Sequence, residues 1–116
     1  MMAGELLEVL NLPGGNPNLI VPFGDLTVIP YLKGNAGMKG QPDNGFISIL
    51  DKDHKILSKL AAPAPVYTDG KLASLGSNTK LFTYPHGILI DDQQSIYVAQ
   101  WNSGKTYPIK LERVKF

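Results

Sequence analysis

The stretch YPHGILIDDQQSIYVAQW, residues 84–101, decides the fold class of this chain. Two runs rich in β-branched and aromatic residues, 87–90 and 95–101, flank a short polar segment that begins with Asp91-Asp92. Short runs of this kind on either side of a polar turn are typical of an antiparallel hairpin. The stretch therefore predicts two neighbouring strands, and Asp91-Asp92 is expected to form their solvated turn rather than a calcium site.

A second copy of this pattern occurs earlier in the chain, which indicates an internal repeat. The matched pairs of segments are 16–21 (NPNLIV) with 84–90, 26–31 (LTVIPY) with 96–101, and 45–51 (GFISILD) with 106–112 (TYPIKLE). Each copy therefore predicts a meander of short strands. The first unit spans residues 16–60 and the second spans residues 84–116 of a single domain, 1–116.

The two units differ in the number of strands that they predict. Residues 55–60 supply a fourth strand to the first unit, whereas the second unit has three. Residues 5–12 precede the first unit, where a fourth strand of another unit would lie. We therefore expect them to pair with the strand that contains Ile109 and Leu111. The predicted fold class is all-β, with two four-stranded antiparallel blades.

Residues 84–91, followed by 95–99, resemble the signature of the NHL repeat, and residues 46–53 resemble its third strand and polar hairpin. The resemblance covers residues 16–60 and 82–114 and is closest to the C-terminal third of a six-bladed β-propeller. It implies propeller blades. It implies no single activity, because the family includes lyases, lactonase-like enzymes and binding scaffolds.

Two blades alone would leave an apolar face exposed on each side and one sheet edge open. We therefore expect a homo-oligomer, with a trimer favoured because three chains give six blades. In such a ring, residues 5–12 would complete the second unit of their own or of a neighbouring chain. The alternatives are a dimer, a tetramer, or a compact monomer that forms a small barrel or sandwich.

Composition excludes several classes of protein. The formal net charge is +1 with both signs scattered, so no basic surface for nucleic acid is expected. No apolar stretch approaches about 18 residues, and residues 1–15 lack the pattern of a signal peptide. We therefore expect no membrane span and a cytoplasmic location. Cysteine is absent, which excludes disulfides and thiolate metal sites.

His86 is the foremost candidate for chemistry. Because neighbouring strands run antiparallel, Gln100, Trp101 and Asn102 at the end of the next strand are expected beside it. Three copies around a threefold axis would bring together three imidazoles, a ligand set that suits zinc with one open position. The resemblance implies the same arrangement, since amidating lyases of the family hold zinc on three channel histidines. The alternative is an imidazole hydrogen-bonded in a polar channel, without metal.

Asn18 and Tyr31 occupy the matching positions of the first unit. Asn18 aligns with His86 and is expected to alternate with it around the channel, unless it serves only as a turn residue. Tyr31 aligns with Trp101, and this aromatic pair is expected to line a ligand pocket or to pack between blades. His54 falls in a polar hairpin and is predicted to lie on the surface.

The chain contains no Ser-His-Asp spacing, phosphate loop or HExxH motif. This favours a module that binds a small-molecule or protein ligand, without a catalytic cluster or a cofactor. One alternative is a metal-dependent lyase or hydrolase with a symmetric His86 site. Another is a gene fragment without evolved activity.

Overall fold

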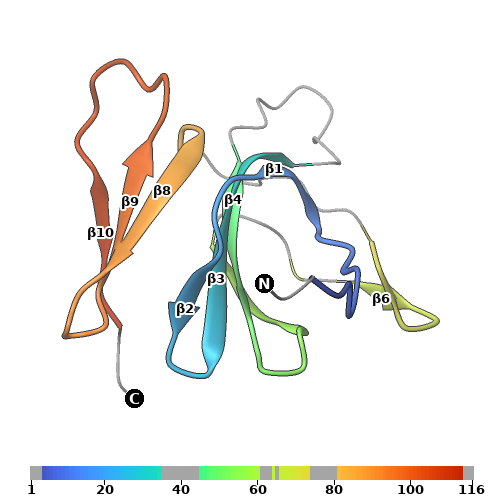
Figure 1. Ribbon diagram of the computed structural model, residues 1–116. Helices are drawn as coiled ribbons and strands as arrows, with labels where there is room; N and C mark the ends of the chain where they lie inside the picture. Colours follow the sequence, from blue (N-terminus) through green and yellow to red (C-terminus); the bar gives the residue numbers. More distant parts are fainter. Residues whose placement is uncertain (1–3, 35–44, 61–63, 65, 74–80, 114–116) are drawn as a thin grey trace.

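The computed structural model describes residues 4–34, 45–60, 64, 66–73 and 81–113. These residues contain no helix, and every strand among them pairs with an antiparallel neighbour (Figure 1). The predicted all-β, antiparallel class is therefore confirmed.

The first sheet is built around β3 (Leu26–Gly34). On one side, β3 pairs with both β1 (Gly14–Pro17) and β2 (Val21–Phe23), which together act as one interrupted first strand. On the other side it pairs with β4 (Phe46–Leu50), and β4 pairs with β5 (Ile56–Leu60). The first unit is thus a four-stranded meander, as the sequence predicts, with β1 and β2 counted as one strand.

The second sheet contains the stretch that decides the fold. Its order is β10 (Ile109–Leu111), β9 (Ile96–Gln100) and β8 (Pro85–Ile90), and both pairs are antiparallel. Between the two sheets in sequence lies a small hairpin of β6 (Tyr67–Thr68) and β7 (Lys71–Leu72). The predicted hairpin of residues 84–101 is confirmed.

Two hairpins close with the same aspartate-based turn. Asp51 Oδ1 accepts backbone N–H bonds from the residues two and four positions ahead, at 2.8 and 3.0 Å, and Asp91 Oδ1 does the same at 2.9 Å in both cases. These bonds lower the pKa of Asp91 because they stabilise its carboxylate, and the bond from Ser95 has the largest effect. Asp91 is therefore a turn residue, as predicted.

Two groups of buried apolar side chains lie on opposite faces of the first sheet. The inter-sheet cluster packs between the two sheets and contains Val28, Ile47, Phe82, Ile96 and Val98. The outer cluster, on the face of the first sheet turned away from β8–β10, contains Ile29, Tyr31, Phe46 and Leu50, with Leu12 and Ile56 packed against it. The first sheet is therefore buried on both faces, because alternate strand residues point to opposite sides.

The pairing registers show how the two units correspond. Pro17 pairs with Tyr31, and the matching Pro85 pairs with Gln100, so Tyr31 corresponds to Gln100. The predicted match of Tyr31 with Trp101 is therefore wrong by one residue. The reason is that the turn before β3 contains two residues whereas the turn before β9 contains five, which an alignment by similarity alone does not resolve.

In the corrected register, equivalent residues of the two sheets point in the same direction. Ile29 now corresponds to Val98. Their partners on the third strands, Ser48 and Ile109, also correspond to each other, in agreement with the sequence match of those two strands. Ile29 belongs to the outer cluster and points away from the second sheet, whereas Val98 points toward the first. The two sheets therefore stack in the same sense, each turning its equivalent face in the same direction.

The N-terminal segment differs from the expectation. Residues 5–12 form no strand, and among the residues that the structure describes β10 pairs with β9 alone. Leu12 packs on the outer cluster and β1 begins two residues later, which holds the segment on the side of the first sheet away from β10 (Figure 1). Residues 5–12 therefore do not complete the second unit within one chain.

Candidate functional site

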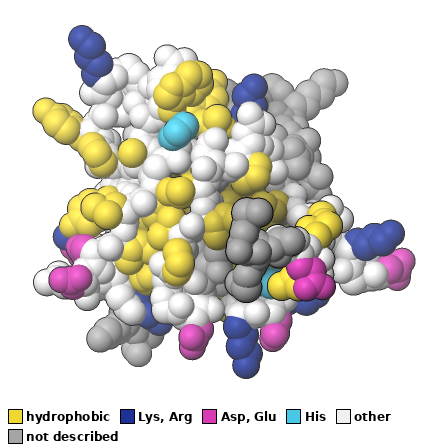
Figure 2. Space-filling model, in the orientation of Figure 1, with side chains coloured by type: hydrophobic (Ala, Val, Ile, Leu, Met, Phe, Trp, Pro, Cys, Tyr) yellow, Lys and Arg dark blue, Asp and Glu magenta, His cyan; other side chains and the backbone are white. Residues whose placement is uncertain are grey.

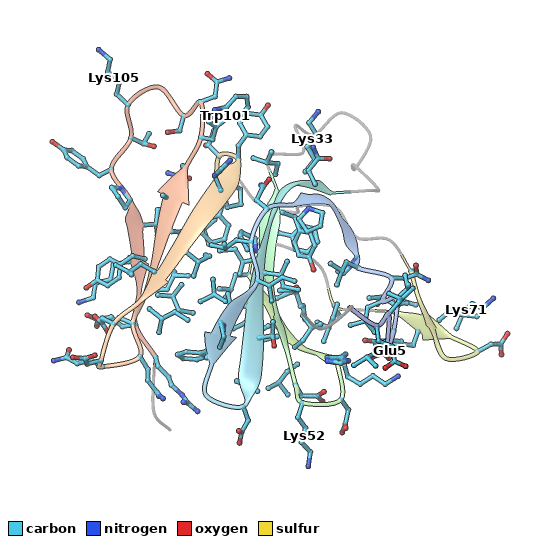
Figure 3. All side chains as sticks on the ribbon, viewed as in Figure 1. Glu5, Lys33, Lys52, Lys71, Trp101 and Lys105 are labelled. Carbon is cyan, nitrogen blue, oxygen red and sulfur yellow. The ribbon has the colours of Figure 1, made fainter. Side chains whose placement is uncertain are left out.

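The start of β8 lies beside the end of β9, as the antiparallel order predicts. Trp101 donates its backbone N–H to the Tyr84 carbonyl at 3.0 Å, and the two rings meet edge to face with centroids 6.1 Å apart. The strand pairing places His86 next to Gln100, and Asn102 follows Trp101 in the same loop. Figure 3 shows Trp101 at the end of the sheet from which the Lys105 loop projects. The structure therefore brings together four of the six predicted site residues.

His86 is exposed because the register shifts between Pro85 and Gly87. This bulge leaves His86 without a directly opposed residue on β9. No group of three His, Asp or Glu side chains placed to hold a metal occurs among residues 4–34, 45–60, 64, 66–73 and 81–113. Each chain thus supplies one imidazole at this position, and a three-histidine site would need further copies.

Gln100 is committed to the structure of its own loop. Its Oε1 accepts the backbone N–H of Thr83 at 2.7 Å, and its Nε2 donates to Thr106 Oγ1 at 3.0 Å. Thr106 in turn donates to Ser103 Oγ at 2.6 Å. The amide therefore ties the segment before β8 to the loop after β9, and we assign Gln100 a structural role.

Tyr31 lies in the core. Its side chain is fully buried, its hydroxyl is 2.8 Å from Ser48 Oγ, and its ring stacks on Phe46 with centroids 4.6 Å apart. Burial raises the pKa of Tyr31 to about 12, because the phenolate would lose its hydration. The expectation that Tyr31 lines a ligand pocket does not fit this position. The one-residue correction of the register explains the difference, since it turns Tyr31 to the opposite face from Trp101.

Asn18 is exposed in the interruption between β1 and β2. Its backbone N–H donates to the Pro30 carbonyl at 3.2 Å, which keeps the interrupted strand against β3. His54 is also exposed, as predicted, and its Nδ1 lies 3.4 Å from Glu8 Oε2.

An exposed apolar surface on the second sheet was not predicted as a site. The face of the second sheet turned away from the first, here called the outer face, consists of Leu89, Tyr97, Ala99 and Pro108. With Gly87 and Ile88 these residues line a depression of about 420 Å³. Leu89 is 66% exposed, and hydrophobic side chains reach the surface over the side of the molecule that β8–β10 occupy (Figure 2). The signal was present in the sequence, because β8 carries apolar residues at consecutive positions and so presents them on both faces.

Polar groups flank the outer face. The Tyr97 hydroxyl donates to Asp91 Oδ2 at 3.2 Å, and Lys110 Nζ lies 5.8 Å from the centre of the Tyr97 ring. Lys110 also pairs with Glu112 at 3.0 Å, and this hydrogen bond is the main reason that its pKa is raised. The outer face is therefore an apolar surface with a charged border, which is the usual anatomy of a protein interface.

Helices of the length and apolarity needed to cross a membrane do not occur in the described part of the chain. Comparisons of the chain with protein families, with curated proteins and with solved structures found no match.

Proposed function

We propose that this chain is a protein-binding module without a catalytic cluster, and that its binding surface is the outer face of the β8–β10 sheet. One observation carries the proposal. The outer face corresponds, position by position, to the face through which the first sheet packs against the second.

The corrected register makes this correspondence specific. Val28 and Ile47, both buried in the inter-sheet cluster, correspond to Tyr97 and Pro108 on the outer face. In the first unit this face covers a neighbouring sheet, whereas in the second unit it forms an exposed depression. Contiguous apolar surface of this kind marks sites of protein association. The fitting partner is therefore the apolar face of another β-sheet.

The same stacking sense supports propeller-like blades of the NHL type. In a propeller, successive sheets pack radially, each through the same pair of faces. The equivalent residues Ile29 and Val98, which point in the same direction, support such packing for the two sheets of this chain. We infer that the chain is a two-blade scaffold whose outer face receives a further sheet.

The test places a photo-crosslinking amino acid at position 89 and, as a matched control, at position 66. Leu89 and Val66 are similarly exposed, at 66% and 55%, but Val66 lies outside both large sheets. We expect protein adducts from position 89 and none from position 66. Equal yields at the two positions, or no adduct at either, would remove the outer face as a binding surface.

A further inference from the structure

Among the residues that the structure describes, the outer edge of β10 has no neighbouring strand. In the first unit, β4 pairs with β5, so the third strand is covered by a fourth. The corresponding strand β10 pairs only with β9 in the described part of the chain. An open strand edge presents unpaired N–H and C=O groups that readily accept another strand.

An apolar groove runs beside this edge. It has a volume of about 220 Å³ and lies between β5 and β10, lined by Leu57 and Leu60 on one side and Leu111 on the other. Phe23 and Ile96 form part of its floor. A strand that pairs with β10 would direct alternate side chains into this groove.

Residues 5–12 have the properties of the missing strand. Leu7 and Val9 are 87% and 78% exposed, which is unusual for two apolar side chains spaced for one face of a strand. The contact of Glu8 with His54 joins two half-exposed side chains, and such pairs contribute little to stability. The residues before Leu12 are therefore held only weakly in their present position.

We propose that residues 5–12 of a second copy of this chain add to β10 as an antiparallel fourth strand. In the antiparallel register that sets Glu8 opposite Lys110, Leu7 lies opposite Leu111 and Val9 lies opposite Ile109. Leu7 and Val9 then face the groove with Leu111 and Ile109. Glu8 meets the Lys110 ammonium on the other face, so this register also brings opposite charges together.

The chain's own segment cannot reach this edge. Leu12 packs on the outer cluster, so the first sheet lies between Leu12 and the second sheet. Val9 is three positions before Leu12, so the two residues lie at most roughly 10 Å apart, whereas packed sheets alone lie about 10 Å apart. Figure 3 shows Glu5 on the side of the first sheet away from β8–β10. A second copy is therefore the occupant, and this inference uses the β10 edge rather than the outer face.

Because the chain has no cysteine, disulfide trapping can test this register directly. A Glu8→Cys protein is mixed with a Lys110→Cys protein, the mixture is oxidised, and the cross-linked species are identified by mass. An Asp69→Cys protein, altered at an exposed hairpin tip, replaces Glu8→Cys in the control. We expect the Glu8–Lys110 pair to cross-link in clear excess over the Asp69–Lys110 pair. Equal yields would overturn the proposal.

Light scattering of the unmodified chain and of two variants gives a second measurement. We expect an oligomer that Leu7→Asp/Val9→Asp weakens by roughly tenfold or more in Kd for each side chain. Val66→Asp, at a similarly exposed position outside both large sheets, is the matched control and should leave the oligomer intact. A chain that is monomeric at every concentration would overturn the proposal. Association that survives Leu7→Asp/Val9→Asp would also overturn it, and would leave the outer-face proposal standing.

Discussion

Replacement of Tyr31 by Phe tests whether this residue belongs to the core or to a binding site. The change removes only the hydroxyl, which lies 2.8 Å from Ser48 Oγ, and leaves the ring stacked on Phe46. No large cavity forms, so the main effect is that the fully buried Ser48 hydroxyl loses its partner. An unsatisfied buried group of this kind destabilises a protein by about 1–3 kcal/mol. We expect Tyr31→Phe to lower the free energy of unfolding by that amount.

The pH dependence gives a second, independent signature of the same residue. Below about pH 10 the tyrosine is protonated in both folded and unfolded chains, so it adds no pH dependence. Above that pH the unfolded chain loses the proton, whereas burial keeps the folded pKa at about 12. Stability should therefore fall as pH rises from about 10 toward 12. A difference of about two pKa units corresponds to roughly 3 kcal/mol.

Urea unfolding followed by circular dichroism, near neutral pH and at steps above about pH 10, measures both effects. Tyr31→Phe should lack the part of the fall in stability above about pH 10 that the tyrosine causes. The double variant Tyr31→Phe/Ser48→Ala should recover much of the stability at neutral pH, because neither polar atom remains. Tyr107→Phe is the control, since Tyr107 is 91% exposed. If Tyr31→Phe has the same stability at neutral pH as the unmodified chain, and the same fall in stability at alkaline pH, the assignment of Tyr31 to the core is wrong.

Three further outcomes follow from single positions. Gly45→Ala should unfold the chain or destabilise it by more than about 2 kcal/mol, because its φ is +90° and a Cβ would clash with the Tyr31 carbonyl oxygen. Gly70→Ala, at φ +78° with open space around it, should lower the free energy of unfolding by only about 1 kcal/mol. Asp91→Ala should lower the melting temperature, because two turn N–H groups lose their acceptor, and an equal melting temperature would contradict the turn assignment. His86→Ala should leave the melting temperature unchanged because His86 is exposed, and metal analysis before and after the change decides whether a symmetric three-histidine site forms.

Local pattern in the sequence determined the strands and their turns. The hairpin of residues 84–101, the polar turn at Asp91 and the neighbourhood of His86 and Trp101 depend on contacts between residues close in the chain. Hairpin pairing follows directly from such short-range signals, since the turn fixes which residues oppose each other. The all-β class and the grouping of strands into two units could therefore be predicted without coordinates.

Only the tertiary structure decided which way each side chain faces and what lies against it. The side-chain period of a strand is two residues, so a difference of one residue in the match between units moves a side chain to the other face. In the structure Tyr31 lies in the core beside Ser48, whereas Tyr97 lies on the exposed outer face. The match between the units made from the sequence, which was off by one residue, did not predict these faces. The position of residues 5–12 was undetermined for a related reason. Their apolar pattern suits a strand, but the anchoring of Leu12 on the far face of the first sheet keeps them from the edge of their own second sheet.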